Sequence, residues 1–363
     1  MIRSLSLAGL LAAAAALPAL AQDKVVHIYN WSDYIAEDTI RKFEAETGIK
    51  VVYDVYDSNE TLEAKLLAGH SGYDVVVPTS NFLQRQIAAG VYQPLDKSKL
   101  PNLENMDPEL MKAAAAYDPD NTYGVIYMWG TNGIGYNVAK VAERLGEDAP
   151  TDSWSLIFDP KYAEKLADCG ITLLDSASEV FPSALTYLGL DPLSKKPEDL
   201  EKAAGVIEAI RPYIRYYHSS QYISDLANGE VCVSLGYSGD VFQAAARAEE
   251  AGKGVEIAYS VPEEGAQQWF DMMAIPVDAP NPEAALAWIN FIMKPEITAD
   301  ITNYVWYANA NTASLPLVDP EIRDDPAIFP GPDVLAKLYP AQVYDARTDR
   351  LITKLWTRAK TGQ

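Results

Sequence analysis

The chain has 363 residues, of which 48% are hydrophobic and 22% are charged, and its formal net charge is −22. This length predicts about two domains, and the composition excludes a disordered chain, a collagen and a small disulfide scaffold. The excess of acidic side chains repels phosphate groups, so we do not expect nucleic acid as a partner.

The first residues have the pattern of a secretory signal peptide. Arg3 precedes an apolar run over 5–17, and the segment 18–21 ends in an A-x-A motif. The run is too short to span a membrane, so we expect residues 1–21 to be cleaved off as a signal peptide. The mature protein is therefore expected to be secreted, to the periplasm or beyond the cell.

Two cysteines, Cys169 and Cys232, remain in the mature chain. In an oxidising compartment an even pair forms a disulfide more often than it stays as two thiols. A catalytic cysteine would need a histidine partner, and the pattern places none of His27, His70 and His218 near a cysteine. The sequence therefore predicts a disulfide.

The first part of the mature chain alternates short strands with helices. Strands are predicted over 25–29, 51–55 and 73–77 from their β-branched, apolar content. A helix between the first two carries apolar residues at helical spacing over 36–43 and ends at Gly48, and a second helix follows Ser58. This β-α-β-α-β order is typical of a parallel sheet covered by helices.

The remainder of the chain predicts a second α/β unit. Small and apolar residues alternate over 129–137, which indicates a strand that links two lobes. The later elements are expected as strands at 171–174 and 231–235, helices at 180–188 and 200–210, extended segments at 255–261 and 269–276, and helices at 284–293, 334–338 and 351–358.

Aromatic and acidic residues recur at the predicted strand ends. In open α/β sheets, ligands bind beyond the carboxyl ends of the strands. The residues at these ends, or in or beside a strand, include Trp31, Ser32, Asp33, Thr79, Glu179, Tyr237, Asp240, Trp269 and Asp271, and Tyr34 also follows the first strand. Singly, each is more often a rim residue or a helix cap, but their repetition in both lobes favours a site.

This combination suits an organic cation. An ammonium ion is attracted to aromatic faces and donates charge-assisted hydrogen bonds to carboxylates. No nucleotide, serine-hydrolase or zinc-protease motif is present, and three dispersed histidines do not form a transition-metal site. We therefore expect no cofactor, no metal and no enzymatic activity.

Five stretches carry a specific resemblance to a known family. The stretches at 30–35 (NWSDYI), 93–101, 133–137, 217–223 and 307–311 are similar to those of periplasmic putrescine/spermidine-binding proteins of ABC importers, and closest to the putrescine-binding branch. These five stretches are distributed along the whole length of the mature chain.

The resemblance implies an α/β fold of the two-lobed, type II solute-binding kind. Each lobe would be a mixed sheet covered by helices, with the ligand in the cleft between the lobes. Lobe 1 would comprise 22–132 plus 258–308, and lobe 2 would comprise 133–257 plus 309–363. The implied function is capture of a polyamine in the periplasm and its delivery to an inner-membrane ABC permease, by a protein expected to be a monomer.

The family's ligand positions map onto the strand-end residues above other than Tyr34, and they add Tyr307. By this analogy Trp31 and Tyr237 stack on the methylene chain, and Asp240 and Asp271 hold the ammonium ends. The chain has Tyr237 where the putrescine branch usually has Trp, Thr79 for Ser, and Trp269 where a Phe can occur. The cysteine pair matches that of the family.

These departures change the walls of the site and leave its charge unaltered, so they bear on which polyamine binds. Trp269 and Asp271 share one face of a strand, so the indole is expected to wall the space beside the carboxylate and to favour putrescine over spermidine. Cadaverine and agmatine stay open as ligands. Two other functions also stay open, a secreted enzyme that acts on amines and a ferric-iron-binding protein of the same fold.

Overall fold

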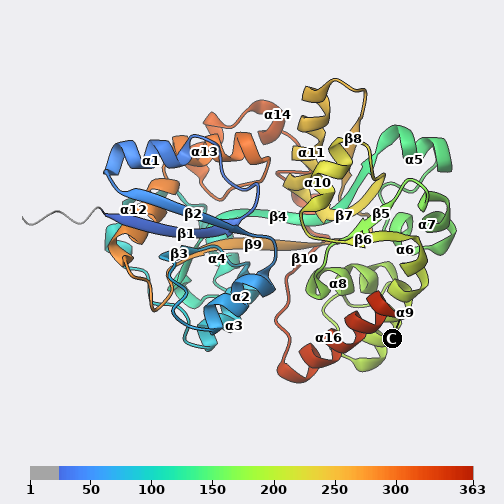
Figure 1. Ribbon diagram of the computed structural model, residues 1–363, viewed down its shortest axis with the longest axis horizontal. Helices are drawn as coiled ribbons and strands as arrows, with labels where there is room; N and C mark the ends of the chain where they lie inside the picture. Colours follow the sequence, from blue (N-terminus) through green and yellow to red (C-terminus); the bar gives the residue numbers. More distant parts are fainter. Residues whose placement is uncertain (1–23, 363) are drawn as a thin grey trace, which may run out of the picture.

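The computed structural model describes residues 24–362, so the predicted signal peptide lies outside the described residues. In this described part, strands form one mixed sheet in the order β2-β1-β3-β9-β4-β7-β5-β6, with β10 paired to β9 and β8 to β4 (Figure 1). The strands are β1 Val25–Trp31, β2 Lys50–Tyr56, β3 Val75–Val76, β4 Gly124–Asn137, β5 Ile171–Leu173, β6 Ile214–Tyr217, β7 Val233–Tyr237, β8 Ile257–Ser260, β9 Ala266–Ala274 and β10 Leu338–Pro340.

The predicted parallel unit at the start of the chain is present. Strand β1 pairs in parallel with both β2 and β3, and helices α1 and α2 connect them. Gly48 ends α1 in the left-handed conformation (φ 68°), and the Ser58 side chain caps α2 by accepting from the backbone N–H of Thr61. The predicted capping residues therefore set both helix boundaries.

Strand β4 connects two halves of the molecule. Its first part, from Gly124 to Thr131, pairs antiparallel with β9, and its second part, from Asn132 to Tyr136, pairs antiparallel with β7. The alternation of small residues has a steric reason, because a Cβ at position 133 would lie 2.4 Å from the hydroxyl of Tyr259. The linking strand predicted over 129–137 is thus the second half of β4.

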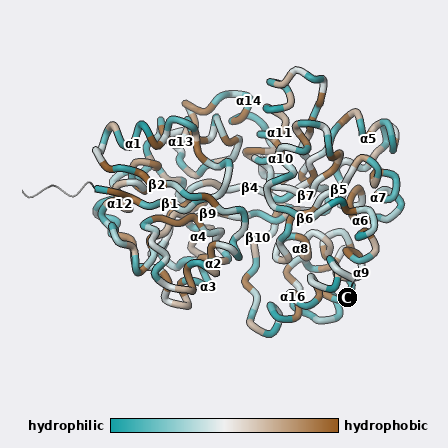
Figure 2. The backbone as a smooth tube through the Cα atoms, in the orientation of Figure 1, coloured by the Kyte–Doolittle hydropathy of each residue, from teal (hydrophilic) through white to brown (hydrophobic). Residues whose placement is uncertain are grey.

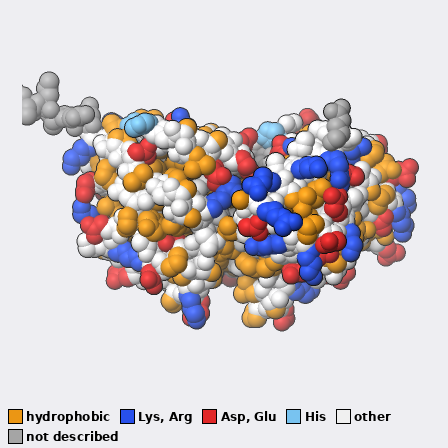
Figure 3. Space-filling view, turned by 90° about the horizontal axis from the view of Figure 1, so that it is seen from below, with side chains coloured by type: hydrophobic (Ala, Val, Ile, Leu, Met, Phe, Trp, Pro, Cys, Tyr) orange, Lys and Arg blue, Asp and Glu red, His pale blue; other side chains and the backbone are white. Residues whose placement is uncertain are grey.

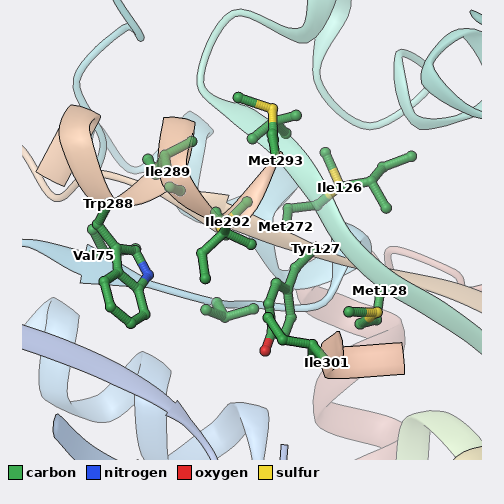
Figure 4. Packing of buried hydrophobic residues seen from close by; sticks show 14 of the residues in the cluster. Val75, Ile126, Tyr127, Met128, Met272, Trp288, Ile289, Ile292, Met293 and Ile301 are labelled. Atoms are coloured by element: carbon green, nitrogen blue, oxygen red, sulfur yellow. The ribbon is translucent and has the colours of Figure 1, made fainter. Parts of the chain in front are cut away.

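Two separate hydrophobic cores define a first and a second lobe. The first-lobe core packs β1, β3, β9 and the start of β4 against α12 and α13, and Figure 4 shows Tyr127, Met272 and Ile292 meeting there. The second-lobe core packs β5 and β7 against α8, α9, α11 and α16. Hydrophobic residues recur along the strands of both lobes (Figure 2).

Helices cover the sheet on both sides (Figure 1). The helices that precede β4 or follow β9 in the chain, with the exception of α16, are α1 Thr39–Thr47, α2 Asn59–Leu67, α3 Ser80–Ala88, α4 Pro108–Ala114, α12 Pro282–Ile292, α13 Pro295–Val305, α14 Pro320–Arg323 and α15 Pro332–Leu335. The others are α5 Val138–Leu145, α6 Ser155–Phe158, α7 Pro160–Leu166, α8 Ala177–Tyr187, α9 Pro197–Ile210, α10 Gln221–Ala227, α11 Ser238–Ala251 and α16 Ala346–Thr361.

The structure corrects the helix predicted over 334–338. Helix α15 ends at Leu335, and Leu338 begins β10, which pairs in parallel with β9 from Ala266 to Gln268. A single turn of helix followed by sheet pairing cannot be recognised from a short apolar run, because tertiary contacts decide between the two conformations.

The division of the chain into lobes stays a prediction. In the segment 309–363, assigned above to lobe 2, the first-lobe core contains Ala310, Ile328 and Ala341, whereas the residues of α16 lie in the second-lobe core. The core packing therefore favours a last boundary after Ala341.

The two cysteines form a disulfide, as predicted, with 5.6 Å between the Cα atoms of Cys169 and Cys232. Each cysteine lies just before a strand, and those strands, β5 and β7, are paired in parallel. The bond therefore joins the amino ends of two neighbouring strands in the second lobe. Between residues 24 and 362, no helix has the length and apolar character that crossing a membrane requires.

Candidate binding site

A cavity lies between the two lobes, at the carboxyl ends of strands from both. The space-filling view shows the outline of the molecule indented between the lobes (Figure 3). The cavity is lined by Trp31, Ser32, Tyr34, Asp57, Thr79, Glu179, Ser219, Ser220, Tyr237, Asp240, Trp269, Asp271 and Tyr307. The structure thus brings together nine of the ten ligand residues expected from the sequence.

Asp33 is the predicted residue that does not line the cavity. It adopts a left-handed conformation (φ 54°), which Asp tolerates better than most residues. Its carboxylate accepts a hydrogen bond from the Arg247 guanidinium at 2.7 Å, and Arg247 lies on α11 of the second lobe. Asp33 therefore contacts the opposite lobe beside the cavity.

Asp271 is the acidic group of the first lobe. It is 4% exposed and accepts hydrogen bonds from the hydroxyls of Thr79 at 2.8 Å and Tyr34 at 3.0 Å. Asn59 donates to the Thr79 hydroxyl at 2.9 Å and so fixes its direction. Burial raises the pKa of Asp271 to about 7, although the two hydroxyls act in the opposite direction by stabilising the carboxylate.

Asp240 lies in the first turn of α11 in the second lobe. It accepts hydrogen bonds from the hydroxyls of Tyr307 at 2.6 Å and Tyr222 at 2.8 Å. Burial raises the pKa of Asp240 to about 6, and the two tyrosine hydroxyls oppose this rise. A Cβ at position 239 would lie 2.3 Å from the ring of Tyr307, so Gly239 lets that ring approach α11.

Glu179 supplies a third carboxylate, from the first turn of α8. The hydroxyl of Tyr237 donates a hydrogen bond to it at 2.8 Å. Burial raises the pKa of Glu179 to about 8, and the hydrogen bond from Tyr237 partly offsets that rise. Glu179 belongs to the second lobe, as Asp240 does, whereas Asp271 belongs to the first.

Among residues 24–362, none of these three carboxylates has a basic partner. In the described chain, no Lys or Arg forms an ion pair with Glu179, Asp240 or Asp271. Burying an ionised carboxylate without a cation is costly. The site is therefore arranged to gain free energy from a positively charged guest.

Aromatic rings form the walls between these acids. The Trp269 ring makes edge contacts with those of Tyr237 (5.7 Å between centroids) and Tyr307 (5.6 Å). The Trp269 indole N–H donates to Asn132 at 3.0 Å, and the Trp31 indole N–H donates to the carbonyl of Val77 at 2.9 Å. Both indoles are therefore held in fixed orientations around the cavity.

This arrangement can bind a flexible organic cation charged at both ends. The rings provide apolar and π surface for methylene groups, and the carboxylates of opposite lobes provide acceptors for two ammonium groups. Within residues 24–362, no three or more His, Cys, Asp and Glu side chains are grouped in a way that could hold a metal ion.

Four lining residues were missing from the predicted set. Tyr34 follows β1 and was selected by the strand-end rule, but the predicted ligand set left it out. Asp57 follows β2, so the same rule applied to that strand selects it. Ser219 and Ser220 follow β6, which was not expected as a strand because its sequence, IRYY, lacks clear alternation. The signal for the two serines was therefore absent until the strand itself was known.

Comparison with known proteins identifies the family and the relatives that this chain resembles. The family of bacterial extracellular solute-binding proteins matches residues 38–330. A putrescine-binding periplasmic protein of Pseudomonas aeruginosa is 55% identical over 99% of this chain and 97% of its own length. A putrescine-binding periplasmic protein of Escherichia coli is 54% identical over 98% of this chain and 96% of its own length.

A solved structure shares the fold. The spermidine/putrescine ABC transporter substrate-binding protein of Streptococcus pneumoniae superposes with a TM-score of 0.76 at 30% identity, over 93% of this chain and 98% of that one. The α/β, type II periplasmic binding fold expected from the sequence is thus confirmed. The chain belongs to the family of bacterial extracellular solute-binding proteins.

Proposed function

We propose that this protein binds an aliphatic polyamine, putrescine first among them, and delivers it to an ABC permease in the inner membrane. The protein is periplasmic, as its relatives are. One observation carries the proposal: buried carboxylates from opposite lobes, without basic partners, face an aromatic-walled cavity. Relatives that are more than half identical over nearly their whole length are putrescine-binding proteins, which supports the same ligand.

The two acids of opposite lobes suggest how the ligand is held. Asp271 of the first lobe and Asp240 of the second would each accept hydrogen bonds from one ammonium group. The rings of Trp31, Tyr237 and Trp269 would pack on the methylene groups between them. Each charge-assisted hydrogen bond contributes about 1.5–3 kcal/mol, so two anchored ends and a desolvated chain are consistent with tight binding.

Delivery to a permease would follow from the two-lobed form. A ligand that bridges both lobes favours the closed arrangement, because only there do the acids of both lobes reach it. A membrane partner could then distinguish loaded protein from empty protein by the distance between the lobes. Only the closed form would present the surfaces of both lobes in one fixed relation.

Calorimetric titration of ligand-free protein tests the proposal. We expect saturable binding of putrescine, with cadaverine, agmatine and spermidine ranked in parallel and 1,4-butanediol as the uncharged control of the same length. Ligand recovered after incubation should be unchanged, whereas an enzyme acting on amines would convert it. Ferric ion titrated in the same way tests the iron-binding alternative.

Matched variants localise the site. Asp240→Asn and Asp271→Asn should each weaken putrescine binding about ten- to hundredfold, because the amide keeps the shape and loses the charge. Asp225→Asn is the control, since Asp225 pairs with Tyr216 outside the cavity. Wild-type affinity in both cavity variants, or equal binding of butanediol and putrescine, would contradict the proposal.

A further inference from the structure

Tyr222 lies behind the cavity wall and touches two residues that line it. Its side chain is fully buried on α10, and its hydroxyl donates to the carboxylate of Asp240 at 2.8 Å. The same hydroxyl accepts from the backbone N–H of Tyr237 at 2.9 Å. One hydroxyl thus ties the end of β7 and the first turn of α11 to a third element, although Tyr222 is not itself part of the cavity lining.

The other hydroxyl on Asp240 comes from the opposite lobe. Tyr307 belongs to the first-lobe core, whereas Asp240 and Tyr222 belong to the second lobe. The bond between Tyr307 and Asp240 therefore exists only while the lobes are together. The bond from Tyr222 lies within one lobe, so it persists when the lobes separate.

The neighbouring strand is shaped to admit Tyr222. A Cβ at position 236 would lie 2.6 Å from the ring of Tyr222 and 3.1 Å from its hydroxyl oxygen. Gly236 in β7 therefore leaves the space through which the hydroxyl reaches Asp240. Two independent features therefore fix the Tyr222 side chain. Its hydroxyl donates one hydrogen bond and accepts another, and a glycine lies against its ring.

We propose that Tyr222 is a positioning residue for cation binding, which holds Asp240 and the start of α11 in the ligand-binding orientation before the lobes close. The inference rests on the proposed function, since it assumes that Asp240 receives an ammonium group. A carboxylate oriented in advance loses less conformational freedom on binding, so the ligand binds more tightly.

The other polar and charged groups near Asp240 belong to residues that a change at Tyr222 leaves unsubstituted. Tyr307 faces it from the first lobe, Arg247 lies on its own helix, and Asp33 pairs with Arg247 at 2.7 Å. Asp271 and Glu179 lie on the walls of the same cavity. A change in the titration of Asp240 on removal of one hydroxyl can therefore be assigned to Tyr222.

Tyr222→Phe tests the proposal, with Tyr216→Phe as matched control because Tyr216 donates to Asp225 at 2.6 Å outside the cavity. Putrescine affinity is measured by calorimetry at pH 8 and pH 6, and Asp240 is titrated by carboxyl ¹³C NMR without ligand. We expect Tyr222→Phe to bind about tenfold more weakly at pH 8. The loss should be larger at pH 6, because removal of a donor raises the pKa of Asp240. The control should match the wild type.

Wild-type affinity in Tyr222→Phe, or an equal loss at both pH values with unchanged titration of Asp240, overturns the proposal. If Tyr222→Phe does not fold, Gly236→Ala replaces it, because the added methyl group crowds the same ring while the hydroxyl is kept. The affinity at both pH values and the titration of Asp240 are then compared in the same way. Failure of the proposed function can be distinguished from failure of this inference. In that case the wild type itself gives no heat with putrescine, and the NMR titration still reports whether Tyr222 acts on Asp240.

Discussion

Asp271 is buried among aromatic rings, and hydroxyls alone satisfy its oxygens. Its raised pKa means that the folded protein holds a proton which the unfolded chain releases. The stability contributed by this proton is therefore lost as the pH rises through about 7. The residue that should attract the ligand thus destabilises the ligand-free protein at alkaline pH.

Asp271→Asn should therefore separate stability from binding. At pH 8 we expect the ligand-free variant to melt about 2 °C above the wild type, because a neutral amide replaces a buried charge. At pH 5.5 the difference should be smaller, since Asp271 is then protonated in the folded protein, and it should vanish only below about pH 4, where the unfolded chain is protonated as well. Differential scanning calorimetry at both pH values checks this, and a variant that melts below the wild type at pH 8 would contradict it.

Binding of a diamine should depend on pH between 5.5 and 8. The ammonium groups stay protonated throughout this range, whereas Asp240 and Asp271 have pKa values of about 6 and 7. The affinity for the diamine should fall by about tenfold or more from pH 8 to pH 5.5, because at the lower pH binding must first remove the protons from these carboxyl groups.

Calorimetry at pH 6.5, in buffers with different ionisation enthalpies, should show proton release on binding. The Asp271→Asn variant is the control, since it has one group fewer to titrate and should release fewer protons. An affinity that is constant across this range would show that these carboxylates are already ionised in the free protein.

Most of the site could be read from the sequence because its residues follow strands. Trp31 and Tyr237 are the last residues of β1 and β7, and Thr79 follows β3 by three residues, and the apolar patterns of these strands are clear. The role of Asp33 could not be predicted in this way. Its neighbour in sequence, Ser32, lines the cavity, while a left-handed turn directs Asp33 toward Arg247, and that partner is more than 200 residues away in sequence.

Helix α11 is one of the elements through which the second lobe contacts the first. Asp240 bonds Tyr307, and the ring of Phe242 stacks on that of Trp306 with 6.3 Å between centroids. Arg247, one turn further on, bonds Asp33. A single helix therefore combines a cavity carboxylate with two contacts at the junction of the lobes.

The disulfide stabilises an element pair away from the cavity. It closes a loop with a sequence separation of 63 residues, for which the chain-entropy model gives about 4 kcal/mol. Cys169→Ser combined with Cys232→Ser should lower the free energy of unfolding in urea by a few kcal/mol and leave putrescine affinity within about twofold. A large loss of affinity would show that the bond also shapes the site.

Elements with strong local patterns were predictable, and those defined by distant partners were not. Helix α9 was expected over 200–210 and extends over Pro197–Ile210, because its apolar residues recur at helical spacing. Strand β3 was expected over 73–77 but is only Val75–Val76, where it pairs with β1 and β9. Strand β10 depends entirely on β9, so no local signal reveals it.

The structure shows the whole molecule with its lobes in contact through α11. Those contacts include a partly exposed ion pair between Asp33 and Arg247, and such pairs contribute only about 0–1 kcal/mol. Because the charges of Asp240 and Asp271 repel each other across the cavity when no cation lies between them, we expect ligand-free protein to open about the β4 crossing. Small-angle scattering should give a smaller radius of gyration with putrescine than without it.

Asp240→Asn supplies the control for this motion. This variant should keep the fold and bind putrescine more weakly. Putrescine at a concentration that just saturates the wild type should therefore leave the radius of gyration of the variant nearly unchanged. The same radius of gyration for wild-type protein with and without saturating putrescine would mean that the site is rigid.

The order of strands in the sheet also constrains how the protein can be made. Strand β3 reaches its antiparallel neighbour only when β9 is available, almost 200 residues later in the chain. A chain that emerges from its amino end thus exposes an unpaired strand edge for most of its synthesis and passage across the membrane. Such edges are prone to pair with other chains. The later segment, β4 to β7, can assemble its own sheet meanwhile, so newly exported molecules are vulnerable to aggregation mainly through the first lobe, whose strand β3 stays unpaired on one side until β9 is available.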